Sequence, residues 1–309
     1  MMQSKPTFRA TPVTIRTPAS SANLGAGFDC LGLALEIYDG YAAQVSDEAG
    51  LDIQVAGEGA DELRKDDKNL LVKAMNRAFD HMGGRPRGLS VRALNAIPHG
   101  RGLGSSSSAI IGGLYLARAL VISGQERLTD QDLLAIATEM EGHPDNVAAA
   151  LYGGATIAWL EGGVGRATPI TVNHRINAVA FIPESAVATS SARKMLPDEV
   201  LYRDATANIA RSALMVEALS NKPEFLYEAT QDLIHQEFRK SAMPKSFALV
   251  QKLRSAGVAA FISGAGPTVL ALHTGSVTDA QEIARAGGSS FATQILGISR
   301  VGAHIYAPN

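Results

Sequence analysis

A glycine- and serine-rich segment at residues 97–109, IPHGRGLGSSSSA, carries the groups best suited to binding a phosphate. Glycine permits positive φ angles and a bare backbone, and a following helix presents unpaired N–H groups and the positive end of its dipole. Such a loop can hold phosphate oxygens, and a serine hydroxyl in it can help to hold Mg²⁺. The segment therefore predicts a phosphate-binding loop, with a flexible loop and a serine N-cap as the alternative.

Two common phosphate-binding motifs are absent from this segment. The Walker pattern requires Gly-Lys-Ser/Thr, and the segment contains no lysine. The dinucleotide-binding fingerprint requires a third glycine where Ser107 stands. Any phosphate bound here is therefore held by a loop of another type.

A second group of polar side chains lies at residues 141–146, EGHPDN, at the start of a predicted helix. It contains two carboxylates, an imidazole and an amide within six residues. The hard Mg²⁺ ion prefers oxygen ligands, so a carboxylate here could bind it beside a phosphate. The alternative is a helix cap, because Asp145 would be favourable in a first helical turn.

Two further segments are rich in small residues, and each would be an ordinary surface turn if taken alone. They are residues 17–35, TPASSANLGAGFDCLGLAL, and residues 262–270, ISGAGPTVL. The C-terminal half adds Arg193 and Arg239. A guanidinium can hold a carboxylate through two parallel hydrogen bonds, although taken alone each arginine reads as a surface residue.

The elements that must position these groups mix strands and helices without strict β-α-β alternation, which favours the α+β class. Strands are expected at 13–17, 32–35, 41–45, 51–55, 89–94, 155–159, 176–182, 258–262, 268–273 and 295–305. Helices are expected at 69–81, 105–121, 130–140, 144–153, 199–218, 222–235, 245–255 and 280–286. A glycine-rich stretch at 161–168 predicts a boundary between two domains, 1–165 and 166–309.

The composition is ordinary for a globular protein, with 309 residues, 46% hydrophobic and 19% charged. A net charge of −2 argues against a broad surface for nucleic acid or an acidic membrane. No apolar run reaches the roughly 18 residues of a membrane span, and the first ten residues lack an apolar signal core. Cys30 is the only cysteine, which fits a reducing compartment. We expect a cytoplasmic protein that binds neither nucleic acid nor membrane.

Three of these segments resemble, in the same order, the three motifs of the GHMP kinases. Residues 98–109 resemble the central motif, residues 17–35 the opening motif of the homoserine kinase branch, and residues 262–270 the third motif. The implied fold has an N-terminal domain like the second domain of ribosomal protein S5 and a ferredoxin-like C-terminal domain. ATP and substrate would meet in the cleft between them. Relatives often form homodimers, so a homodimer is expected.

The resemblance implies a role for each matching position. ATP would be bound by Pro98, Gly100, Arg101, Gly102, Leu103, Gly104, Ser105, Ser106, Ser107, Ser108, Gly264 and Gly266. Mg²⁺ would be held by Ser106 and Glu141, with Glu139 as a substitute for Glu141. The amino-acid substrate would be bound by Asn23, Asp29, His143, Arg193 and Arg239. In that assignment the arginines hold the substrate carboxylate, Asp29 and His143 lie near its ammonium group, and Asn23 lies near its hydroxyl.

The implied reaction moves the γ-phosphoryl group of ATP to the hydroxyl of L-homoserine, giving O-phospho-L-homoserine for threonine biosynthesis. Phosphoryl transfer depends mostly on positioning and on charge stabilisation. Asp145 and Asn146 are the implied catalytic residues. Asp145 is the nearest candidate for a general base, although the reaction can also proceed without one. Asn146 could orient the hydroxyl or a water.

Two other functions fit part of this pattern. Another GHMP kinase, such as a mevalonate kinase, would not use Arg193 and Arg239 to recognise an α-amino acid. A non-catalytic nucleotide-binding sensor would not need the intact Glu141, Asp145 and serine loop. A serine hydrolase would need a G-x-S-x-G elbow, which the sequence lacks.

Overall fold

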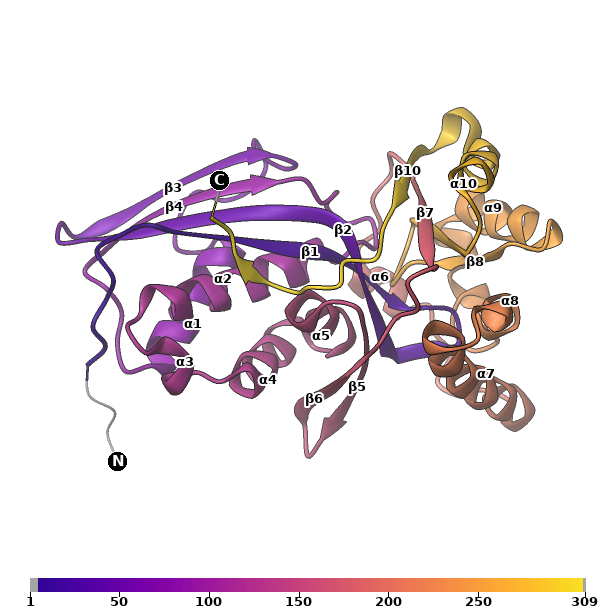
Figure 1. Cartoon of the computed structure of the whole chain (residues 1–309), viewed down its shortest axis with the longest axis horizontal. Helices are drawn as coiled ribbons and strands as arrows, with labels where there is room; N and C mark the ends of the chain where they lie inside the picture. Colours follow the sequence, from indigo (N-terminus) through magenta and orange to yellow (C-terminus); the bar gives the residue numbers. More distant parts are fainter. Residues whose placement is uncertain (1–4, 308–309) are drawn as a thin grey trace.

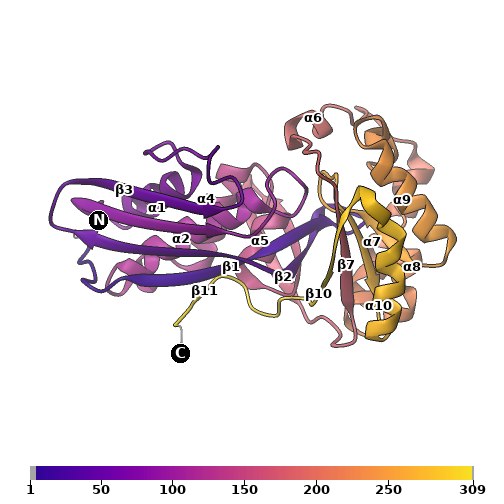
Figure 2. The same cartoon turned by 90° about the horizontal axis from the view of Figure 1, so that it is seen from above.

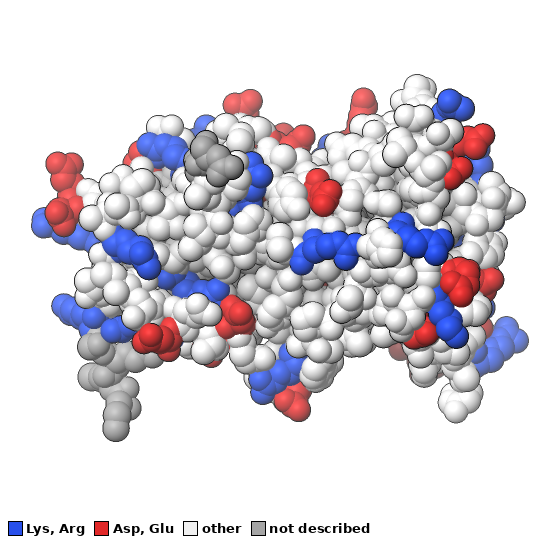
Figure 3. Space-filling model, viewed as in Figure 1, with Lys and Arg blue, Asp and Glu red and all other residues white. Residues whose placement is uncertain are grey.

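The computed structural model describes residues 5–307, which form two units, each built on its own β-sheet. Figure 1 shows the larger, N-terminal unit on the left and the smaller unit on the right, and Figure 2 shows the same pair from above. Both units combine a sheet with helices, so the predicted α+β class is confirmed. On the face shown in Figure 3, basic and acidic side chains are interspersed and separated by uncharged surface.

The sheet of the larger unit has seven strands, in the order β11-β1-β2-β4-β3, with β5 paired to β2 and β6 to β5. All its pairs are antiparallel except β3 with β4. The strands are β1 (Val13–Asn23), β2 (Gly27–Ser46), β3 (Gly50–Gly57), β4 (Gly88–Asn95), β5 (Ala155–Glu161), β6 (Val164–Ile170) and β11 (His304–Ile305). The register of β1 on β2 shifts at Pro18/Ala19, and beyond that irregularity the two strands run toward the second unit.

Helices cover one face of this sheet (Figure 1). They are α1 (Leu70–His81), α2 (Ser105–Leu120), α3 (Gly124–Arg127), α4 (Asp130–Glu141) and α5 (Asp145–Tyr152). The first core cluster, which includes Ile15, Phe79 and Leu114, lies between the helices and the sheet. Gly113 allows α2 to pack closely on α1, because a Cβ there would lie 2.3 Å from the carbonyl oxygen of Leu71.

The second unit is built on an antiparallel sheet in the order β10-β7-β9-β8. Its strands are β7 (Asn177–Ile182), β8 (Ala259–Ile262), β9 (Val269–His273) and β10 (Ala292–Leu296). Its helices are α6 (Thr189–Arg193), α7 (Tyr202–Ser220), α8 (Leu226–Ala229), α9 (Pro244–Ser255) and α10 (Val277–Ala284), with short 3₁₀ helices η1 (Pro223–Phe225), η2 (Glu237–Ala242) and η3 (Arg285–Ser290).

The two units share one apolar core cluster. Leu33 and Leu35 on β2 belong to the same buried cluster as Met215 and Leu219 on α7 and Phe261 on β8. The far half of the β1–β2 pair therefore packs as part of the second unit. The pocket described below lies where the two units meet.

Two predicted elements are wrong. The helix expected at 222–235 ends at Ala229, because the Asp232 carboxylate accepts the backbone N–H groups of residues 234–236 and turns the chain. The strand expected at 295–305 breaks after Leu296, where Gly297 packs so closely on Glu36 that a Cβ would lie 2.3 Å from its carboxylate. The glycine-rich stretch at 161–168, near which the domain boundary is predicted, includes the turn between β5 and β6, which pair with each other. The domain boundary between residues 165 and 166 falls within β6, and it stays a prediction.

Candidate active site

A pocket of about 230 Å³ lies between the two units, and both units contribute its walls. The larger unit contributes the loop between β1 and β2, the loop before α2 and the segment between α4 and α5. The second unit contributes α6, η2 and the turn between β8 and β9. The lining residues are Ala22, Asn23, Asp29, Gly100, Gly102, Gly104, Ser105, Ser106, Glu141, His143, Asp145, Asn146, Thr189, Arg193, Arg239, Gly264 and Ala265. Every residue predicted to be catalytic, substrate-binding or metal-binding therefore meets at one pocket.

The backbone of the glycine loop follows a path that needs glycine. Gly100, Gly102 and Gly104 have φ angles of 65°, 74° and 70°, in the left-handed region. A Cβ on Gly102 would lie 2.3 Å from the carbonyl oxygen of Ser263, and one on Gly104 would lie 2.1 Å from Oγ of Ser20. The loop is therefore packed between β1 and the β8–β9 turn, and no side chain separates its backbone from the pocket.

The four serines after this loop have different environments. Ser105 and Ser106 line the pocket at the N-terminus of α2. The hydroxyls of Ser106 and Ser107 donate to Oε1 of Glu141, at 2.6 and 3.1 Å. Ser108 is fully buried, and its hydroxyl donates to Oδ2 of Asp39 on β2 at 2.8 Å. The four serines thus supply hydroxyls to the pocket, hydrogen bonds to Glu141 and a buried hydrogen bond to Asp39.

The other residues predicted to bind ATP support the loop from outside the pocket lining; they are Pro98, Arg101, Leu103 and Gly266. The guanidinium of Arg101 donates to the carbonyl oxygens of His99, Pro183 and Glu184, so it joins the loop to the second unit. Leu103 lies in the shared core cluster. Direct nucleotide contact by these four residues stays a prediction.

The segment between α4 and α5 places three polar side chains in contact. Nδ1 of His143 lies 2.6 Å from Oδ1 of Asp145, which also accepts the backbone N–H of Asn146 at 2.7 Å. Burial lowers the pKa of His143, but the hydrogen bond and charge of Asp145 more than offset this, so its pKa is raised above the ordinary value. Since Asp145 is almost fully buried, its carboxylate is held in one orientation.

The amide of Asn146 is oriented by a residue of β1. The hydroxyl of Ser20 donates to Oδ1 of Asn146 at 2.9 Å. The amide oxygen is therefore engaged behind the pocket, and the amide N–H₂ is the end that can serve a ligand. Asn146 can act as a hydrogen-bond donor in this site.

The loop between β1 and β2 is held by the side chain of Asn23. Its Nδ2 donates to the carbonyl oxygen of Gly264 at 2.9 Å, and its Oδ1 accepts the backbone N–H of Asp29 at 3.0 Å. Asn23 and Asp29 have φ angles of 72° and 53°, which Asn and Asp adopt more readily than most residues. Asn23 thus connects two of the predicted motifs at the pocket wall.

The two predicted arginines lie side by side at the second-unit wall. Arg193 binds both carboxylate oxygens of Asp29, at 2.8 and 2.9 Å. Arg239 is 3% exposed, and its pKa is lowered by burial and by the neighbouring charge of Arg193. The ring of Phe28 lies 5.9 Å from the guanidinium of Arg193 and 5.5 Å from that of Arg239, and it stacks on His235. Two cationic groups therefore meet at one end of the pocket.

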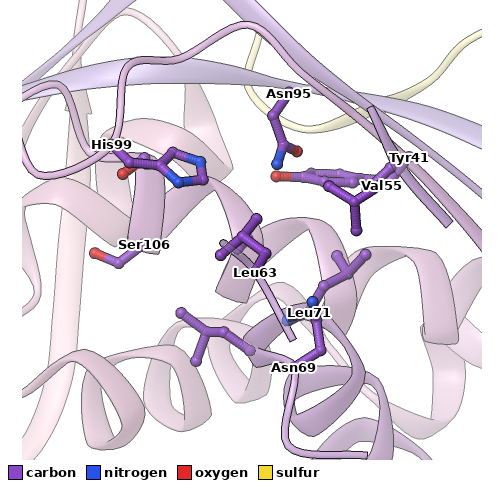
Figure 4. A pocket seen from close by; sticks show the side chains of 12 residues that line it. Tyr41, Val55, Leu63, Asn69, Leu71, Asn95, His99 and Ser106 are labelled. Atoms are coloured by element: carbon purple, nitrogen blue, oxygen red, sulfur yellow. Dashed lines mark hydrogen bonds between the residues drawn. The ribbon is translucent and has the colours of Figure 1, made fainter. Parts of the chain in front are cut away.

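A second pocket, of about 210 Å³, shares Ser105 and Ser106 with the first. Figure 4 shows side chains from several elements converging on it, with Ser106 at its edge. Its walls are mainly apolar, and Tyr41, Asn69, Asn95 and His99 add polar groups. The remaining lining residues are Val55, Leu63, Leu70, Leu71, Ala93 and Ala109. An apolar pocket with a few polar groups suits a flat heteroaromatic ring.

Several residues of this site carry no local sequence signal. Ser20 and Phe28 lie within the opening motif at 17–35, but that resemblance assigns a role only to Asn23 and Asp29, and Tyr41 lies in a predicted strand where an aromatic residue is ordinary. The walls of the second pocket come from β2, β3, β4 and α1 as well as α2, so only the tertiary fold brings them together. Thr189 also lines the pocket, and its only link to a predicted site residue is that it precedes Arg193 on the same short helix, α6.

Family models match most of this architecture. The model of the GHMP kinases N terminal domain matches residues 69–154, and that of the GHMP kinases C terminal region matches residues 210–292, together more than half of the chain. A homoserine kinase from Streptomyces coelicolor is 51% identical over 300 residues, which cover 97% of this chain and 96% of that protein. The chain belongs to the homoserine kinase branch of the GHMP kinases. The predicted family and two-domain fold are confirmed.

Other relatives agree with this placement. A homoserine kinase from Leifsonia xyli is 46% identical over 260 residues, covering 84% of this chain and 80% of that protein. The crystal structure of a homoserine kinase from Cytophaga hutchinsonii superposes with a TM-score of 0.85 and 26% identity, covering 97% and 98% of the two chains. A mevalonate diphosphate decarboxylase from Staphylococcus aureus, at 15% identity and a TM-score of 0.66, shares the fold.

This GHMP kinase is an ATP-dependent enzyme that phosphorylates a hydroxyl group of a small molecule. Within residues 5–307, no helix has both the length and the apolar character that crossing a membrane requires.

Proposed function

We propose that this GHMP kinase transfers the γ-phosphoryl group of ATP to the hydroxyl of L-homoserine, giving O-phospho-L-homoserine for threonine biosynthesis. The observation that carries the proposal is the division of charge in the 230 Å³ pocket. One end holds Arg193 and Arg239 beside Asp29, and the other holds the serine loop and Glu141. Such a pocket fits a small zwitterion whose hydroxyl points toward a phosphate.

In this proposal the second-unit wall recognises the amino-acid group of the substrate. Arg193 and Arg239 bind the carboxylate, because guanidinium groups match its planar geometry. Asp29 binds the ammonium group. The sequence predicts His143 near that ammonium group too, but its raised pKa and its contact with Asp145 favour a role in orienting Asp145.

The nucleotide is proposed to span the two pockets. Its phosphates bind the glycine loop and the N-terminus of α2, where backbone N–H groups and the helix dipole favour anions. Its base occupies the pocket of Figure 4, which adjoins the phosphate site at Ser105 and Ser106. The apolar side chains of that pocket would stack on the base.

The residues present fit a magnesium ion held largely by the nucleotide. Glu141 and Ser106 supply oxygen atoms at the pocket, at 2.6 Å from each other. Within residues 5–307 no cluster of three acidic, histidine or cysteine ligands occurs, so phosphate oxygens and water would complete the coordination. Bound there, the ion would neutralise charge on the phosphates. Glu139 is engaged with Arg77 at 2.6 Å on the surface, which favours Glu141 as the ligand.

The remaining work of catalysis is positioning. In this proposal Asp145 accepts the proton of the substrate hydroxyl or holds that hydroxyl in line, and the contact with His143 supports one orientation of its carboxylate. Asn146 presents its amide N–H₂, a donor suited to a phosphate or hydroxyl oxygen. The loop amides stabilise charge on the transferred group.

A coupled ADP-release assay tests the substrate. With MgATP we expect ADP release with L-homoserine and none above background with mevalonate or galactose. Release with mevalonate but not L-homoserine would retain the kinase and overturn its substrate. No release with any of the three would favour the non-catalytic sensor.

The homodimer and the cytoplasmic location are also proposals. Size-exclusion chromatography with light scattering tests the first, and a mass corresponding to one 32.4 kDa chain would contradict it.

A further inference from the structure

Asp39 is a buried carboxylate on β2 that lies outside both pockets. Its side chain is 1% exposed and accepts four hydrogen bonds. Oδ1 accepts the backbone N–H groups of Ala96 and Ile97, at 2.8 and 3.0 Å. Oδ2 accepts the hydroxyls of Ser108 and Tyr41, at 2.8 and 2.9 Å. The carboxylate is thus stabilised entirely by neutral donors, which oppose the rise in its pKa that burial causes.

These contacts hold the glycine-serine segment, here called the phosphate loop (residues 97–108), at both of its ends. Ile97 is the first residue of the glycine-serine segment, and Ser108 lies in the first turn of α2, where the segment becomes helical. The residues between them include three glycines with positive φ. Such a loop has many alternative conformations, and fixing one of them costs conformational entropy. A single side chain that joins its two ends restricts those alternatives.

The same carboxylate also fixes a wall of the second pocket. The ring of Tyr41 lines that pocket, and its hydroxyl is bound by Asp39 and lies 3.2 Å from Oγ of Ser108. On its other side the ring packs against Gly112, where a Cβ would lie 2.4 Å from it. Asp39 therefore connects the phosphate loop and the wall of the base pocket at one point (Figure 4 shows Tyr41 at that wall).

We propose that Asp39 is a positioning residue that holds the phosphate loop and the base pocket in the geometry that binds the nucleotide. The inference rests on the proposed role of these two pockets in binding ATP. It assigns Ser108 a role in this contact in place of direct contact with the nucleotide.

Two substitutions of Asp39 should have different effects, because they keep different numbers of its hydrogen bonds. In Asp39→Asn, the amide oxygen can keep both backbone N–H groups, and the amide N–H₂ can donate to the two hydroxyls, which then act as acceptors. In Asp39→Ala, the N–H groups of Ala96 and Ile97 and the hydroxyls of Ser108 and Tyr41 all lose the carboxylate as their acceptor. The first substitution retains the tie between the loop ends, and the second removes it.

The test is calorimetric titration of the full chain with ADP, which needs no acceptor substrate. We expect Asp39→Ala to raise the dissociation constant about tenfold or more and Asp39→Asn less than about threefold. Ser108→Ala, which removes only the tie at the α2 end, should lie between them. The KM for L-homoserine at saturating ATP should change less than about twofold in each variant.

Val45→Ala is the matched control, because Val45 lies on the same strand, is partly buried against the core cluster and pairs with Leu89 of β4. It should lower the melting temperature and leave ADP binding unchanged. ADP binding by Asp39→Ala equal to that of the wild type would overturn the proposal. If Asp39→Ala does not fold, Ser108→Ala decides, and wild-type affinity in it would overturn the proposal. A wild type that binds no ADP would instead refute the assignment of the nucleotide site.

Discussion

The guanidinium of Arg193 on α6 binds both oxygens of Asp29 on β2 at one end of the pocket. Each partner is also proposed to bind one end of the substrate zwitterion. L-Homoserine would therefore replace one ion pair within the protein by two between protein and ligand, its carboxylate taking Arg193 and its ammonium group taking Asp29. Both residues are partly exposed, so the pair can open at modest cost.

Replacing either partner should weaken substrate binding specifically. We expect Arg193→Ala and Asp29→Ala each to raise the KM for L-homoserine about 10- to 100-fold, because each removes a charge-assisted contact. The KM for ATP should stay within about twofold. Steady-state kinetics measure both constants. An unchanged KM for L-homoserine in Arg193→Ala would mean that the pair is only a structural contact between the units.

Ser20→Ala should reduce turnover more than binding. Without the Ser20 hydroxyl, the Asn146 amide loses the partner that orients its donor toward the pocket. We expect kcat to fall about tenfold, with both KM values changed less than about threefold. Thr17→Val is the control, because Thr17 is buried on the same strand and its hydroxyl has no hydrogen-bond partner among residues 5–307. Equal losses in the two variants would assign the effect to packing of β1.

The two glutamates at the end of α4 should differ in their effect on magnesium dependence. Glu141→Gln should raise the Mg²⁺ concentration needed for half-maximal activity by about tenfold or more, because a neutral amide is a weaker ligand than a carboxylate. Glu139→Gln should leave it unchanged, since Glu139 pairs with Arg77 outside the pocket. The measurement is activity against free Mg²⁺ at fixed ATP. The reverse pattern would make Glu139 the ligand.

The contact between His143 and Asp145 should make stability depend on pH. Because folding raises the pKa of His143, the protonated pair contributes stability that is fully present below the unfolded pKa, about 6.5. That contribution is lost as the pH rises through the folded pKa. In Asp145→Asn the two largest raising causes, the hydrogen bond and the charge of Asp145, are removed, while burial and the weaker influence of Glu141 and Asp29 remain, so the pKa of His143 should fall relative to the wild type. NMR titration of the imidazole checks the direction, and an unchanged pKa would contradict it.

Many of the residues that line the pocket could be predicted from the sequence, because they stand in short segments with local signals. The glycines at 100, 102 and 104 and the cluster at 141–146 could be identified before the fold was known, and both line the pocket. Asp39 and Ser20 could not be identified in this way. Apart from Tyr41, which also binds Asp39, their partners lie 57 or more residues away in the chain, so their importance arises from tertiary contacts.

The errors in secondary structure have a similar origin. The helix expected at 222–235 had a favourable pattern, but the Asp232 carboxylate binds three backbone N–H groups and ends it. The turn that results places His235 on the carbonyl oxygen of Gly25, at 2.7 Å, and brings Arg239 to the pocket. A regular helix would have lacked this turn.

The core cluster shared by the two units has a consequence for dissecting the protein. Cutting the chain between β6 and β7 would leave Leu33 and Leu35 exposed on one fragment and Met215 and Phe261 exposed on the other. Neither fragment would bury its own apolar surface, so each would aggregate or stay unfolded when expressed alone. Domain exchange between homologous kinases would succeed only if this cluster were transplanted intact.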